Sequence, residues 1–181
     1  ALGTGGMKSK LKAARLATAA GGAVVMANGS RDGYPSTAQA CHGEFTKCGP
    51  ADGTIAAGGL RNFAGLNEQT ANRWTKVNIK PGLNTFDWRY TAVHATRNWQ
   101  FYITKKDWNP NQPLTRDSFE TVPLLTDNWN NTLPTKTGGT TSHKVNIPAD
   151  RSGYHIVLGT WMVGDNTNTF YLVVDVNIEN S

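Results

Sequence analysis

A single histidine, His94, stands between two segments in which apolar and polar residues alternate, 84–90 before it and 99–103 after it. It therefore falls where two strands would be joined, at the rim of a sheet. A histidine there is a candidate metal ligand, because imidazole nitrogens bind transition metals. One imidazole does not hold a metal, so further ligands must come from elsewhere in the chain.

Three aspartates and two other histidines could support different chemistry. Glycoside hydrolysis needs two carboxyl groups facing each other across a cleft, and Asp150, Asp165 and Asp175 are available for it. Nothing in the sequence pairs them, and Asp150 is typical of a turn. His143 and His155 lie in strand-like segments without acidic or cysteine neighbours, so we expect surface or half-buried polar residues.

Two tryptophans offer a further possibility. Trp108 and Trp129 lie among Asn- and Thr-rich segments, where an aromatic face could stack on a sugar ring. The alternative is that these side chains pack on their own domain. The sequence leaves both interpretations open.

The segments that must position these residues are strand-like. Apolar and polar residues alternate between Pro-Gly, Asn-Pro and Gly-Gly turn signals in residues 84–90, 99–103, 143–147, 153–161 and 170–178. We expect two buried faces, one of Phe86, Trp88 and Tyr90, the other of Phe170, Leu172, Val174, Val176 and Ile178. This spacing favours an all-β fold, an antiparallel β-sandwich of the immunoglobulin or fibronectin III type. Residues 63–74 fit a short helix or an irregular crossover.

Length and composition exclude several classes of protein. The 181 residues suit one domain, 1–181, and only 17% of them are charged. The net charge is +5, but no basic stripe or RNA-binding aromatic motif accompanies it, so we expect no nucleic-acid partner. No apolar run reaches the ~18 residues that a membrane span requires, so we expect no membrane partner either.

The first 48 residues differ from the rest, being rich in Ala and Gly, and we expect a helical or loop insertion there. Residues 7–27 have the basic start and apolar run of a secretory signal peptide, although a short basic amphipathic helix has the same layout. Export would allow a disulfide between Cys41 and Cys48, and free thiols are the alternative.

Several motifs together resemble a known family. They follow one another in the family's order: GPADGTIA at 49–56, LNEQTANRW at 66–74, TAVHAT at 91–96, residues 99–113, IPADRSGYH at 147–155, and DNTNTFY at 165–171. This series is similar to the bacterial chitin-active lytic polysaccharide monooxygenases, auxiliary activity family ten, formerly chitin-binding module family 33. The resemblance covers roughly residues 49–179.

The resemblance implies a secreted enzyme that holds one copper ion in a histidine brace. Such an enzyme takes electrons from an external donor and oxidatively cleaves crystalline chitin, or, less expected, cellulose. His94 matches the second brace histidine, Phe170 the aromatic residue at the axial position and Ala92 the small residue above the copper. Asp165 and Asn168 match the loop that shapes the copper surroundings. We expect a monomer.

The first brace histidine, which begins the mature chain in the family, has no match at Ala1. A segment bearing it could precede this sequence, or removal of residues up to Ala27 could leave Asn28 in its place. His42 is a third candidate, although it is internal and has no free amine. The competing function is therefore a chitin-binding protein that does not cleave its substrate.

Overall fold

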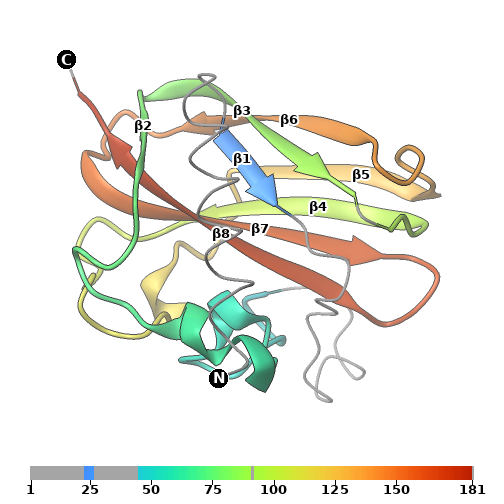
Figure 1. Ribbon diagram of the computed structural model, residues 1–181. Helices are drawn as coiled ribbons and strands as arrows, with labels where there is room; N and C mark the ends of the chain where they lie inside the picture. Colours follow the sequence, from blue (N-terminus) through green and yellow to red (C-terminus); the bar gives the residue numbers. More distant parts are fainter. Residues whose placement is uncertain (1–22, 27–44, 91, 181) are drawn as a thin grey trace.

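The computed structural model describes the backbone of residues 23–26 and residues 45–90 and 92–180, and it forms two facing β-sheets (Figure 1). One sheet has the strand order β1–β3–β6 and the other the order β2–β8–β7–β4–β5. The strands are β1 Ala23–Met26, β2 Val77–Ile79, β3 Gly82–Arg89, β4 Thr96–Ile103, β5 Leu125–Thr132, β6 Thr140–Ile147, β7 Gly153–Val163 and β8 Thr169–Ile178. The expected all-β sandwich is confirmed.

The main core lies between the two sheets and follows from the alternation in the strands. Phe86 and Trp88 on β3 are fully buried, and Tyr90 directly after β3 is 1% exposed. They meet the inward-facing residues of β4, β6, β7 and β8, among them Trp99, Phe101, Val145, Ile147, Val157, Trp161, Phe170, Leu172, Val174, Val176 and Ile178. Both predicted buried faces are therefore confirmed.

The sheets are not wholly antiparallel, which corrects the expectation. β1 pairs with β3 and β2 pairs with β8 in parallel, whereas all other pairs are antiparallel in the described residues. Parallel neighbours need long connections, and residues 80–168 lie between β2 and β8. β1 falls inside the signal-like segment 7–27, whose remaining residues lie outside the described part of the chain.

Short 3-10 turns cover the outer face of the five-stranded sheet. They are η2 Ile55–Ala57, η3 Arg61–Asn67 and η4 Arg116–Ser118. With Phe45, Leu114 and Phe119 they bury outward-facing side chains of β4, β7 and β8 in a second core. Trp108 joins this core, and its Nε1 donates to the carbonyl of Tyr154 at 2.9 Å. The crossover expected at 63–74 is thus in part a 3-10 turn.

Two further findings concern the cysteines and the membrane. Cys48 is disulfide-bonded, but Cys41 lies outside the described residues, so the pairing stays a prediction. Within the described residues no helix has the length and apolar character needed to cross a membrane.

A half-buried carboxyl group, that of Asp175, lies on the outer face of β8. The hydroxyl of Tyr154 donates to Oδ1 of Asp175 at 2.5 Å, and the Gln69 side chain donates to that hydroxyl at 2.9 Å. Burial raises the pKa of Asp175 from 3.8 to about 6, because a carboxylate loses hydration there. The folded protein therefore holds this proton more tightly than the unfolded chain does.

We predict that the contribution of Asp175 to the free energy of unfolding decreases as the pH rises. Its contribution to folding is complete below pH 3.8 and is lost as the pH passes about 6, the folded-state pKa. The loss amounts to up to about 3 kcal/mol at ~1.4 kcal/mol per pKa unit. Asp175→Asn should abolish this contribution, so its stability relative to wild type should rise between pH 4 and 7. Urea unfolding across that range measures it, and a pH-independent difference would contradict the prediction.

Candidate metal centre

Three connections gather at one end of the sandwich. They are the β3–β4 connection that carries Ala92 and His94, the turn between β7 and β8 that carries Asp165 and Asn168, and the segment that follows β5. In Figure 1 this is the right-hand end, where the β7–β8 turn projects. Two neighbouring antiparallel pairs, β4 with β7 and β7 with β8, bring His94 and Asp165 together.

His94 is held by a carboxylate. Its Nδ1 lies 3.0 Å from Oδ2 of Asp165, and the two side chains are 30% and 43% exposed. An ionised carboxylate only accepts hydrogen bonds, so Nδ1 carries a proton, and in the neutral imidazole Nε2 then keeps its lone pair. Among the described residues Nε2 has no hydrogen-bonding partner. A carboxylate that fixes the tautomer of a histidine in this way is typical of metal sites.

An aromatic platform lies behind the ring of His94. The centroid of its ring is 6.0 Å from that of Phe170 and 5.8 Å from that of Trp161. Phe170 and Trp161 are 3% and 1% exposed, and their rings stack at 4.7 Å. One side of the imidazole therefore faces packed apolar atoms while the ring itself remains partly open to solvent.

The strands beside His94 are irregular. Thr96 on β4 pairs with Val163, and Asn98 pairs with Met162, so Arg97 is an extra residue bulged from the ladder. On the other side three β5 residues, 129–131, lie opposite Arg97. Asn130 and Asn131 adopt left-handed conformations with φ of 49° and 62°. Bulges bend strands and reorient side chains, often beside functional sites.

The bulge in β5 also contacts the turn that carries Asp165. The side chain of Asn131 occupies the space where a Cβ on Gly164 would lie. The amide of Gly164 donates to the carbonyl of Ala95 at 2.6 Å. Gly164 thus joins the two connections next to His94 and Asp165, and a larger residue there requires the Asn131 side chain to move.

The remaining predicted site residues occupy the same end. Ala92 is exposed two residues before His94, and the carbonyl of Asn168 accepts from the amide of Val163 at 3.2 Å. Within the described residues no three His, Cys, Asp or Glu side chains form a metal-binding group. The described residues thus fit one imidazole ligand for copper, and His42 lies outside them.

Comparison with known proteins fits this geometry. The family model described as "Lytic polysaccharide mono-oxygenase, cellulose-degrading" matches residues 4–176. The chain belongs to this family. A curated relative, GlcNAc-binding protein A of Aliivibrio fischeri, is 47% identical over 135 residues, 75% of this chain and 27% of the relative. The chain thus spans about a quarter of the length of such relatives.

Solved structures of lytic polysaccharide monooxygenases share the fold. One, an AA10 enzyme from Photorhabdus luminescens, has a TM-score of 0.74 at 36% identity, covering 77% of this chain and 79% of that chain. Another, a CBM33 protein of Bacillus amyloliquefaciens in complex with Cu(I), has a TM-score of 0.66 at 50% identity, with 75% of each chain covered. Copper binding is thus found among the structural relatives of this family member.

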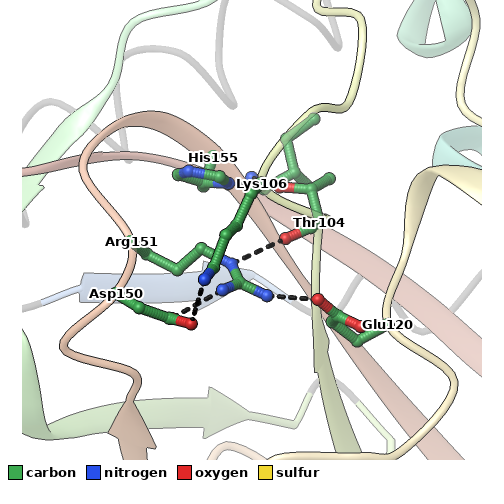
Figure 2. Close-up of polar contacts among 7 residues, drawn as sticks. Thr104, Lys106, Glu120, Asp150, Arg151 and His155 are labelled. Atoms are coloured by element: carbon green, nitrogen blue, oxygen red, sulfur yellow. Dashed lines mark hydrogen bonds and ion pairs between the residues drawn. The ribbon is translucent and has the colours of Figure 1, made fainter.

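A second polar cluster lies near the start of β7, away from the end that carries His94. Arg151 is 4% exposed and pairs with Glu120 and Asp150 (Figure 2). Its Nε donates to the carbonyl of Thr104 at 3.3 Å, while the Thr104 hydroxyl lies 2.8 Å from Nδ1 of His155. These contacts tie the loop before β7 to β4, and they describe a structural ion-pair network.

The two other histidines of the described chain correct an expectation. His143 and His155 are buried, 2% and 3% exposed, rather than surface or half-buried. His143 also has acidic company, because its Nδ1 lies 3.0 Å from Oδ2 of Asp127 on the neighbouring β5. Burial lowers the pKa of both histidines, and Arg151 lowers that of His155 further. Both face neighbours from distant strands that the local sequence does not reveal.

The aspartates considered for hydrolysis have separate partners. Asp150 binds Lys106 and Arg151, Asp165 binds His94, and Asp175 accepts from Tyr154. These contacts tie each of them to a different part of the sandwich and do not pair them with one another. The ring of Trp129 packs edge-on against that of Trp99, with 5.3 Å between the centroids, so it is partly buried against the main core.

We predict that Gly164→Ala disturbs the His94–Asp165 contact and that Asn131→Gly restores it. The added methyl group collides with the Asn131 side chain and displaces the turn, whereas the double variant removes the obstacle. Nitrogen NMR of the His94 ring should show loss of the Nδ1–H form in the single variant only. Asn130→Gly, which keeps the Asn131 side chain, is the control that should not rescue. Equal spectra for all variants would contradict the prediction.

Proposed function

We propose that the chain is a secreted, copper-dependent lytic polysaccharide monooxygenase acting on chitin, with His94 as a copper ligand. The observation that carries the proposal is the His94 imidazole, held at Nδ1 by Asp165 with its second nitrogen free of hydrogen bonds among the described residues. Relatives named for binding GlcNAc, the repeating unit of chitin, favour chitin over the cellulose of the family description. The disulfide at Cys48 supports export, because disulfides persist in oxidising compartments.

The residues of the chain have distinct tasks in this function. Bound copper would supply the redox chemistry that oxidises a C–H bond at the glycosidic linkage, with electrons from an external donor. His94 binds through Nε2 while Asp165 retains the proton on Nδ1 and fixes the ring plane. Phe170 excludes water behind the imidazole, and the small side chain of Ala92 lets a flat polysaccharide surface approach.

Asp165 and Asn168 shape the rim. The turn that carries them is closed by the amide of Asn168, which donates to Oδ1 of Asn166 at 2.7 Å. A preorganised turn keeps the carboxylate on His94 without an entropic penalty at the moment of binding. We propose that the protein works as a monomer, with this end as its contact with the polysaccharide.

The second candidate function is chitin binding without cleavage. It is favoured by the finding that the described residues place only one imidazole at this end and no three-residue metal group. A binding protein needs a surface that contacts the polysaccharide but does not need the redox centre. The two functions make different predictions for the reduced, copper-loaded protein.

We predict that His94→Ala abolishes copper-dependent oxidation of chitin. Loss of a ligand should weaken Cu(II) binding more than about 100-fold, measured by calorimetry with Cu(II) alone, because the remaining groups cannot replace the imidazole. Products are sought by mass spectrometry of β-chitin incubated with ascorbate and copper. Lys144→Ala, an exposed position on β6, is the control and should behave as wild type.

The outcomes separate the two functions. Oxidised oligosaccharides from wild type but not from His94→Ala support the monooxygenase. Chitin binding without oxidised products in the wild type supports the binding protein. Unchanged Cu(II) affinity in His94→Ala would refute the ligand role.

A further inference from the structure

A buried threonine connects the core to the main chain of His94. Thr96 is 0% exposed, and its hydroxyl has two partners. Nε1 of Trp161 donates to Oγ1 of Thr96 at 2.7 Å, and the hydroxyl donates to the carbonyl of His94 at 3.2 Å. The roles are unambiguous, because an indole nitrogen can only donate and a carbonyl oxygen can only accept.

The far end of this connection is rigid. The ring of Trp161 stacks with that of Phe170 at 4.7 Å and is nearly parallel to that of Trp99, whose centroid lies 6.3 Å away. The edges of Tyr90 and Trp88 close it in at 5.0 and 6.0 Å. Trp161 cannot move without repacking the core, so the position of its N–H is fixed.

The backbone of Thr96 is held within the sheet on both sides, whereas His94 lies outside the ladder. Thr96 pairs with Thr132 on one side and Val163 on the other. His94 lies two residues before this first paired position of β4 and outside the ladder. Among the described residues, its side chain is held by Asp165 and its carbonyl by Thr96.

We propose that Thr96 is a positioning residue for the metal ligand, an inference that rests on the proposed function of His94. Asp165 sets the rotation of the imidazole, and Thr96 sets the position of the main chain from which the ring projects. Both constraints are needed to place Nε2, because a ring fixed only at Nδ1 can still pivot about that hydrogen bond. The two hydrogen bonds, from Trp161 to Thr96 and from Thr96 to His94, thus connect the rigid core to the proposed metal ligand, His94.

The test compares Thr96→Val, which keeps the shape but removes the hydroxyl, with Thr96→Ser, which keeps the hydroxyl. The first readout is made without metal: nitrogen and proton NMR of the His94 ring and of the Trp161 indole N–H. Thr96→Val should shift both sets of signals, and Thr96→Ser should restore them. The second readout is titration with Cu(II) alone, followed by EPR. We expect affinity to fall about 10- to 100-fold in Thr96→Val and to stay within about threefold of wild type in Thr96→Ser.

Thr104→Val is the matched control. Thr104 is also 0% exposed, and its hydroxyl accepts from the amide of Ile156 at 3.1 Å, but it lies at the other end of the sandwich. A comparable loss of stability with unchanged His94 signals is expected. If Thr96→Val does not fold, Trp161→Phe removes the donor while leaving an aromatic ring in the stack, and it should shift the His94 signals in the same direction.

Each outcome decides between the claims. Unaltered His94 signals and unaltered Cu(II) affinity in a folded Thr96→Val or Trp161→Phe variant overturn the positioning role. A disturbance as large in Thr104→Val also overturns it, since the effect would then be general loss of stability. If wild type binds no Cu(II), the proposed function fails, while the metal-free spectra still test whether Thr96 orients His94.

Discussion

The stacking of Trp161 with Phe170 and Trp99 is the interaction on which the rest of this end of the molecule depends. It joins β4, β7 and β8 within one layer of the core, and it carries the only polar atom of the indole toward β4. Dense aromatic packing resists displacement. A partly exposed histidine can therefore hold a defined position although it belongs to no strand.

The two ends of the sandwich use polar groups differently. At the end away from His94, Arg151 pairs with Glu120 and Asp150, Lys106 supplies a second positive charge at Asp150, and the network anchors the loop before β7. At the His94 end one carboxylate binds one imidazole, and Nε2 of that imidazole has no hydrogen-bonding partner in the part of the chain that the structure describes. The first arrangement is closed, whereas the second leaves capacity for a ligand.

Alternation predicted the strands that face the core, because burial of every second residue leaves a strong signal in β3, β4, β7 and β8. It missed β5, an edge strand that contains Asp and several Asn residues, which are rare in strands, and β2, which has only three residues. The parallel edge pairs were unpredictable because register between distant segments has no local signature.

The candidate site was predictable only in part. The motif resemblance singled out His94 and Asp165, which the structure brings into contact. Thr96 and Gly164 were not found, since a buried hydroxyl and a missing Cβ gain meaning only from neighbours on other strands. The prediction that His143 and His155 are surface or half-buried residues was wrong for the same reason. Their partners, Asp127 and Thr104, come from other strands or from the end of one.

The polar side chains and the bulge of β5 bear on whether the protein aggregates at high concentration. β5 is an edge strand of its sheet in the described part of the chain, and an edge strand can pair with a strand of a second molecule. Two successive residues in the left-handed conformation interrupt that edge, and most of the other side chains along β5 are Asp, Asn and Thr. The irregularity beside His94 therefore also guards the protein against aggregation.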